Sequence, residues 1–156
     1  MADMTTEAEL DQLSQAAQTL ATREDIQDTI ARLKREVPET TDTFVWSTIE
    51  LPVPGVALPK HILSGWIFVL KADTPSGAHQ HPNSIQHMLL LEGKGRSCVG
   101  DEWKQMRVSE WTVIPEGVAH EFFPEGDAMV VMSFHTCLAE DLEEVAVGTG
   151  VSRHYT

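Results

Sequence analysis

The sequence predicts an all-β protein, a sandwich or a barrel, with two α-helices in front of it. From residue 39 onward the chain breaks into short runs rich in β-branched and aromatic residues, separated by Gly, Pro, Asp and Asn. Many short strands at close spacing are typical of a sandwich or barrel, and the absence of an internal repeat favours one barrel. Before residue 38 the apolar residues recur every three or four positions, which indicates helices. The predicted strand runs are FVWSTI, GWIFVL, IQHMLLL, RSCV, WKQMRV, WTVI and MVVMSF.

The first predicted helix begins at a capping box, Thr6-x-x-Glu9, which satisfies backbone N–H groups of the first helical turn. Its apolar face is formed by Leu10, Leu13, Ala17 and Leu20.

A second helix is predicted to begin at Thr22-x-x-Asp25 and to end before Pro38, because proline disfavours the helical conformation of the residue that precedes it. Its apolar face is formed by Ile26, Ile30, Leu33 and Val37. We expect the segment 1–38 to pack on the barrel or across a dimer interface.

The length of 156 residues fits one domain, with the helical segment 1–38, a barrel over 39–142 and an extended tail over 143–156. No apolar run approaches the ~20 residues that cross a bilayer, and the acidic N-terminus has no features of a signal peptide. The two cysteines lack the spacing of a disulfide scaffold and are expected to be free thiols. We therefore expect a soluble, cytoplasmic protein.

The charge of the chain limits the classes of partner that it is expected to bind. With 24 acidic and 11 basic residues, the formal net charge is −13. This charge repels nucleic acid and anionic membranes, so neither is an expected partner. The expected partner is a small molecule, and an anionic one would be drawn to a bound metal cation.

Three histidines form the pattern that carries chemistry. His79 and His81 stand two residues apart, and on a strand this spacing places both imidazoles on one face, where they can reach one ion. Such a pair alone is a weak signal, because many are surface accidents. A third histidine, His120, follows a Pro115-x-Gly117 turn that places it at the start of the next strand.

Together these segments, from about residue 65 to residue 134, resemble the two conserved motifs of the cupin superfamily. The resemblance implies a small single-domain cupin, with a double-stranded β-helix (jelly-roll) barrel and a homodimeric state. It also implies one bound divalent transition metal, which could be Mn, Fe, Zn or Ni. The implied metal ligands are His79, His81, Gln86 and His120.

Gln86 stands where the superfamily usually has Glu. Its position in the motif is that of a metal ligand, whereas Ile85 and His87 point to the opposite face of the strand. This favours Gln86 as a fourth ligand over a site of three histidines alone. His87 is then expected to face outward or to lie at an interface. A neutral amide leaves the double positive charge of the ion uncancelled, which strengthens a Lewis acid and counts against dioxygen chemistry.

His135, next to the run MVVMSF, is the candidate catalytic residue. If it faces the barrel interior it can act as a general acid or base, since imidazole titrates near neutrality. The alternative is a hydrogen-bonded core or rim histidine.

Three functions are consistent with these residues. The first is a metal-dependent lyase or isomerase that acts on a small oxygenated or anionic substrate by Lewis-acid catalysis, since the metal shell is similar to that of uronate-linearising cupins. We expect no arginine after the last strand to bind a substrate carboxylate, which weakens a uronate substrate. Dimethylsulfoniopropionate lyases are similar in size, but this chain has Tyr155 as its only tyrosine. The alternatives are a cupin dioxygenase and a ligand-binding or sensor cupin that is not an enzyme.

Overall fold

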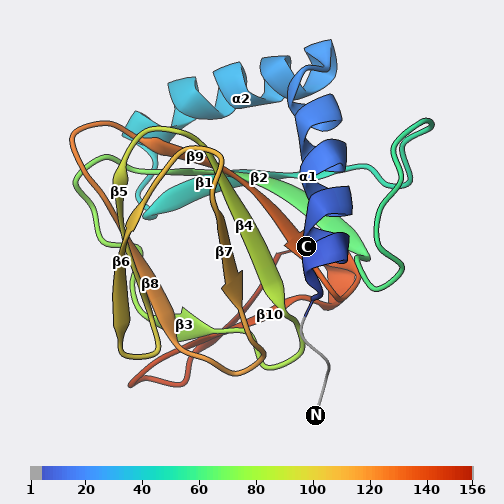
Figure 1. Cartoon of the computed structure of the whole chain (residues 1–156). Helices are drawn as coiled ribbons and strands as arrows, with labels where there is room; N and C mark the ends of the chain where they lie inside the picture. The colour runs from blue at the N-terminus through green and yellow to red at the C-terminus, as the bar shows by residue number, and fades with distance from the viewer. Residues whose placement is uncertain (1–4, 156) are drawn as a thin grey trace.

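The structure, a computed structural model, describes residues 5–155 and confirms the predicted all-β class with two N-terminal helices (Figure 1). Residues 1–4 and 156, where the predicted segments 1–38 and 143–156 begin and end, lie outside the described residues. In the described part, no helix has the length and apolar character needed to cross a membrane. The helices are α1 (Glu7–Ala21) and α2 (Glu24–Glu36), and the strands are β1 (Phe44–Ile49), β2 (Ser64–Leu70), β3 (His79–Gln80), β4 (Gln86–Glu92), β5 (Gly95–Val99), β6 (Glu102–Met106), β7 (Trp111–Ile114), β8 (His120–Pro124), β9 (Met129–His135), β10 (Glu143–Ala146) and β11 (Ser152–His154).

The strands form two antiparallel sheets. One has the order β1-β2-β9-β4-β7 and the other the order β11-β10-β3-β8-β5-β6. Side chains from the inner faces of both sheets fill the barrel with a core rich in aromatic residues and methionine. The interior residues include Phe44, Trp66, Phe68, Leu90, Phe122 and Val131.

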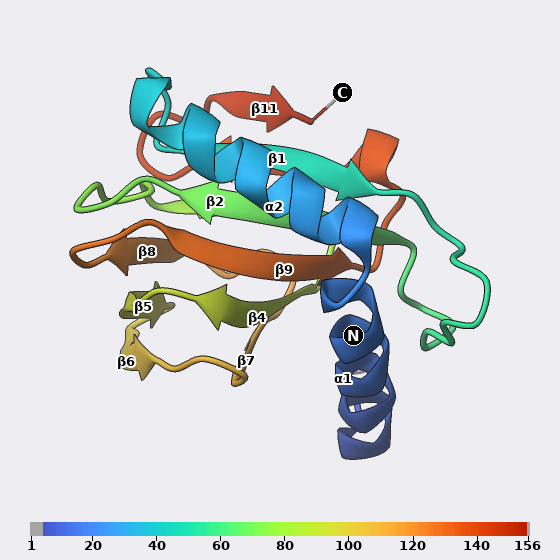
Figure 2. The same ribbon diagram turned by 90° about the horizontal axis from the view of Figure 1, so that it is seen from above.

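The five-stranded sheet is buried on both faces, which explains why its central strands read as nearly continuous apolar runs. Successive side chains on a strand point to opposite faces. On β4, Met88 accordingly points into the barrel core, whereas Leu89 joins a second core on the outside of the sheet. Helices α1 and α2 cover this outer face, and α2 runs across β1 and β2 (Figure 2).

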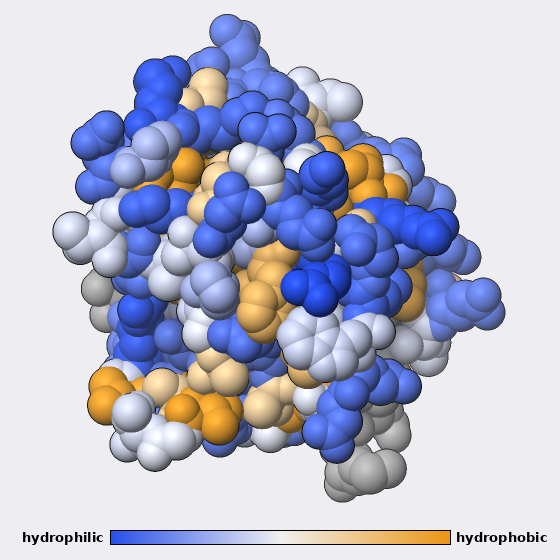
Figure 3. All heavy atoms as spheres, turned by 90° about the vertical axis from the view of Figure 1, so that its left-hand side faces the viewer, coloured by the Kyte–Doolittle hydropathy of each residue, from blue (hydrophilic) through white to orange (hydrophobic). Residues whose placement is uncertain are grey.

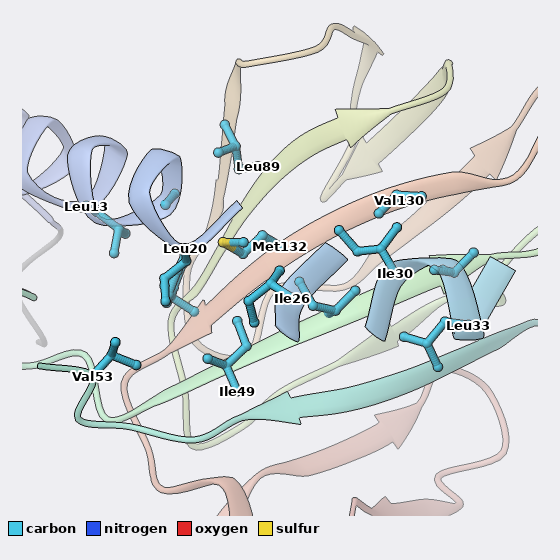
Figure 4. Close-up of a cluster of buried hydrophobic side chains, with 14 of the residues drawn as sticks. Leu13, Leu20, Ile26, Ile30, Leu33, Ile49, Val53, Leu89, Val130 and Met132 are labelled. Carbon is cyan, nitrogen blue, oxygen red and sulfur yellow. The ribbon is translucent and has the colours of Figure 1, made fainter. Parts of the chain in front are cut away.

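The second core binds the helices to the barrel. Leu13 and Leu20 of α1 and Ile30 of α2 are buried against residues of β2 and β9, as Figure 4 shows for part of the cluster. The capping box predicted at Thr6 and Glu9 is present at the start of α1. The helices are therefore an integral layer of the fold.

The predicted start of the second helix at Thr22 differs from the structure. The helix is capped at Arg23, which makes no side-chain capping hydrogen bond. The Thr22 hydroxyl instead donates to the carbonyl of Thr19, so this residue ends α1 rather than beginning α2.

The segment predicted to be an extended tail, 143–156, instead contributes two strands to the barrel. Strands β10 and β11 form the edge of the six-stranded sheet, with Val145 opposite Gln80 of β3. The physical reason is apolar burial, because Leu142 and Tyr155, which flank these strands, are both buried in the barrel core. The barrel thus extends to the end of the described chain.

The surface over β5 and β6 is mostly hydrophilic. On this side of the molecule the apolar residues form small separate patches between polar ones (Figure 3). The exposed apolar residues on β6 and the turn after it include Trp103 and Val108. The face does not show an extended apolar surface.

Candidate metal centre

The fold brings the three predicted histidines together. His79 lies on β3 opposite His120, the first residue of β8, and His81 follows β3 directly. One ring nitrogen of each imidazole lies within 4.8 Å of the others, and the His79 and His120 ring centroids are 4.3 Å apart. This cluster has the size of a site for one ion.

The Pro-x-Gly turn predicted before His120 is fixed to the His79–His81 segment. The backbone N–H of Gly117 donates to the carbonyl of His81 at 2.9 Å. Gly117 has φ of +72°, a conformation that side chains other than glycine rarely adopt. The glycine therefore allows the turn to lie close to the His79–His81 segment. The turn in this position brings His120 next to the other two histidines.

Hydrogen bonds fix the tautomer of each histidine. Each Nδ1 contacts a backbone carbonyl oxygen, which can only accept, so each Nδ1 carries the proton and each Nε2 presents a lone pair. Metal-ligating histidines commonly show this pattern, in which the second ring nitrogen is held by an outer partner. The carbonyl acceptors are those of Gly77 for His79 (3.0 Å), Glu143 for His81 (2.8 Å) and Val118 for His120 (3.0 Å).

Burial keeps two of these imidazoles neutral. Desolvation lowers the pKa of His81 to about 4 and outweighs the raising effect of its hydrogen bond to Glu143. Desolvation also lowers the pKa of His120 well below its ordinary value. Neutral imidazoles are the form that binds metals, so the site is ready for a cation near neutral pH.

Gln86 points into the same region from the other sheet. Its side chain is buried and its Nε2 donates to the Ser133 hydroxyl at 3.1 Å. Within residues 5–155, neither the Gln86 Oε1 atom nor the His120 Nε2 atom has a hydrogen-bond partner, although both are buried. An unpaired buried acceptor is costly, and a cation between these atoms would remove that cost. The donor set therefore fits a divalent transition metal.

His135 lies beside the cluster, on the inner face of β9 and opposite Gln86. It is fully buried, its Nδ1 contacts the Ser84 hydroxyl at 2.8 Å, and its ring centroid is 5.1 Å from that of His81. Burial lowers its pKa well below the ordinary value. Among the described residues, neither His135 nor His120 lines the cavity itself.

His87 points to the opposite face from Gln86, as strand phase requires, but it is not exposed. Its side chain is fully buried, its Nδ1 donates to the carbonyl of Phe134 at 3.1 Å, and its Nε2 contacts the Thr5 hydroxyl at 2.5 Å. The segment that leads into α1 covers this histidine on the outer face of the sheet, and the sheet itself separates it from the cluster.

A small cavity of about 30 Å³ opens beside the histidines. His79, His81 and Gln86 form its polar end, and apolar side chains form most of the remaining wall. The apolar wall consists of Phe44, Phe68, Leu70, Met88, Phe122 and Tyr155. A pocket with an apolar body and a few convergent polar groups is typical of a small-molecule site.

The C-terminal strands supply site residues that sequence reasoning missed. Glu144 of β10 lines the cavity, with its Oε1 atom 3.4 Å from His79 Nε2. The Tyr155 hydroxyl donates to the same carboxylate. Arg153 corrects the expectation that no arginine follows the last strand: its guanidinium lies 3.6 Å from Glu144 and 3.1 Å from Asp42. No motif marks these residues, and the four-residue strand β10 shows too little alternation to indicate them.

Comparison with known families identifies residues 66–137 with the family described as Cupin domain. This segment contains all four predicted metal ligands and His135. A comparison with curated proteins found no match.

Solved structures show the same fold at low identity. A mutant of salicylate 1,2-dioxygenase from Pseudoaminobacter salicylatoxidans, in complex with gentisate, has a TM-score of 0.63 and 16% identity over 81% of this chain and 37% of its own. The Schizosaccharomyces pombe Cnp3 cupin domain has a TM-score of 0.51 and 13% identity, over 63% of this chain and 69% of its own. KdgF from Halomonas sp. has a TM-score of 0.50 and 14% identity, over 61% of this chain and 80% of its own. This chain thus spans 37% of the dioxygenase, and the likeness shows the fold alone.

Proposed function

Since residues 66–137 of this chain match the cupin domain family, we propose that the protein is a metal-dependent enzyme, a lyase or isomerase that acts on a small oxygenated molecule. The observation that carries the proposal is the convergence of three histidine Nε2 atoms, each held by a carbonyl at Nδ1, next to a cavity. Catalytic metal sites keep an open side, whereas structural sites are closed.

In this proposal His79, His81 and His120 hold one divalent transition metal and Gln86 supplies a fourth, neutral donor. A metal held there supplies a Lewis acid that polarises an oxygen atom of the bound molecule. The apolar wall of the cavity excludes water and lowers the local dielectric constant, which strengthens electrostatic interactions at the site.

His135 enters the proposal as a positioning residue. It contacts the Ser84 hydroxyl on one side and the His81 ring on the other, so its contacts support the orientation of His81. A direct role as general acid or base requires contact with the substrate, and the arrangement of the cavity favours the supporting role.

The dioxygenase alternative is supported only by fold likeness to the salicylate enzyme. The neutral donor set counts against it, because such a set disfavours the higher oxidation state of iron. A cytoplasmic location and a homodimeric state stay predictions from the sequence.

The test uses protein loaded separately with Mn, Zn and Fe and a panel of small hydroxy-carbonyl compounds, sugars and phenols. We expect elimination or isomerisation products with the Mn or Zn form and no oxygen consumption. The His81→Asn variant should lose turnover, and His154→Asn, which changes an exposed histidine on β11, should keep it. Oxygen uptake by the Fe form that depends on a phenol would contradict the proposal and favour the dioxygenase.

A further inference from the structure

We propose that Glu144 belongs to the binding site, as a fixed negative charge and hydrogen-bond acceptor that makes the metal centre select neutral ligands with an O–H or N–H group over anions. This inference rests on the proposed function, because it takes a metal at the three histidines as given. It also specifies the ligand class, which the cupin motifs leave open.

The sheet register places Glu144 at the cluster. Strand β10 pairs with β3 so that Val145 lies opposite Gln80 and Ala146 opposite His79. The same register sets Glu144 opposite His81, with its side chain on the face that carries the histidines. Strand β10 therefore contributes to the site together with β3, β4 and β8.

When His79 is in the neutral form that binds metals, its contact with Glu144 is favourable only if a third group is present. His79 Nδ1 carries the proton that it donates to the Gly77 carbonyl, so in the neutral imidazole the Nε2 atom has only a lone pair. The Glu144 Oε1 atom faces this lone pair at 3.4 Å. Two acceptors at this distance repel each other, whereas a cation or a donor hydrogen beside them is stabilised by both. The pair therefore marks a place for a metal together with a ligand that donates a hydrogen bond.

Other residues hold the carboxylate in place. The Tyr155 hydroxyl donates to Glu144, and burial, with the neighbouring Glu144 carboxylate, raises the pKa of this phenol, so the proton stays on it. The Tyr155 ring packs edge-on against Trp66, with centroids 5.4 Å apart. Arg153 lies 3.6 Å from the outer oxygen of Glu144 but is shared with Asp42. The Glu144 carboxylate is thus held in a fixed orientation, and Arg153 neutralises its negative charge only in part.

The side chains that line the rest of the cavity offer no positive charge to an anion. Among the described residues that line it there is no lysine or arginine, and Glu144 is the one carboxylate. An anion at the metal would face this charge in a region of low dielectric constant. A neutral ligand can bind the metal through one atom, donate to Glu144 from its O–H or N–H, and pack its apolar part on Phe68 and Phe122.

The test measures ligand preference with Co(II)-loaded protein at pH 8, where visible absorption reports changes in metal ligation. Azide is the anionic probe, and imidazole is the neutral probe with an N–H donor. In the Glu144→Gln variant we expect azide to bind roughly tenfold more tightly, a change of about 1.4 kcal/mol, and imidazole to bind no more tightly than in the wild type. Glu140→Gln removes the same charge from an exposed residue before β10 and should leave both affinities unchanged.

Two results would overturn the inference: an azide affinity that is unchanged in Glu144→Gln, or one that rises equally in Glu140→Gln. If Glu144→Gln does not fold, Glu144→Asp withdraws the carboxylate by one methylene group and should shift azide binding in the same direction by a smaller factor. A wild-type protein that does not bind Co(II) would overturn the proposed function itself, and so the two failures are distinguishable.

Discussion

The imidazole of His81 donates its Nδ1 proton to the backbone carbonyl of Glu143 at 2.8 Å, across 62 positions of the sequence. Through this contact the C-terminal strands orient a predicted metal ligand from the first cupin motif. Strand β10 thereby supports the candidate metal centre.

Removal of residues 143–156 should therefore damage the site as well as the barrel edge. The truncation removes the His81 acceptor, Glu144 and the buried Tyr155. Loss of outer partners of a metal ligand commonly weakens metal binding 10–100-fold, so we expect at least that loss for zinc in competition with a chromogenic chelator. A truncated protein that binds zinc like the full chain would show that these strands do not support the site. Tyr155→Phe, which keeps the strand pairing, serves as the control and should lose much less affinity.

Replacement of Gln86 tests whether it is a ligand. Gln86→Leu removes the unpaired buried oxygen and should weaken metal binding, whereas Gln86→Glu adds a carboxylate that cancels one charge of the ion and should strengthen it. The measurement is the dissociation constant for zinc of each purified variant. If both variants bind with wild-type affinity, three histidines hold the metal without Gln86.

The metal-free protein should lose stability as the pH falls below about 6.5, the ordinary histidine value. The His81 pKa of about 4 in the folded state means that between these values the unfolded chain binds a proton that the folded chain does not. The free energy of unfolding therefore falls with falling pH, by about 2 kcal/mol from this group between pH 7 and pH 5.

Urea unfolding with a chelator present, at pH 7 and pH 5, measures this effect. The His81→Gln variant has no such group and should lose about 2 kcal/mol less than the wild type over the same interval. Equal losses in both proteins would show that burial of His81 does not govern the acid sensitivity.

The helical layer should contribute directly to stability. Leu20 is fully buried in the core between α1 and the five-stranded sheet, so Leu20→Ala should lower the free energy of unfolding by about 3 kcal/mol. Gln18→Ala, at an exposed position of the same helix, should change it by less than about 0.5 kcal/mol. A small effect of Leu20→Ala would mean that α1 packs on the barrel only loosely.

The parts of the fold that were predictable are those with local patterns. The central strands are apolar runs because both faces of their sheet are buried, and the capping box of α1 lies within four residues of sequence. The fold class was confirmed, and residues 66–137, which hold both motifs, match the family described as Cupin domain. The roles of Gln86 and His135 stay predictions.

The parts that were not predictable depend on distant contacts. Glu144 meets His79 only because β10 pairs with β3, and a strand of four residues carries too little periodicity to reveal this pairing. Thr22 matched a helix-start pattern, but the hydroxyl had a carbonyl of the preceding helix within reach. In both cases the residue that determines the outcome, His79 for Glu144 and Thr19 for Thr22, is not part of the sequence pattern used for the prediction.

The central claim is that His79, His81 and His120 hold one divalent metal. The most direct test is the metal content of protein purified without added metal and then saturated with zinc or manganese and desalted, for the wild type and for the His81→Asn, His120→Asn double variant. The account predicts one ion per chain in the wild type and almost none in the double variant. A wild type without stoichiometric metal, or a double variant that takes up as much as the wild type, would contradict it.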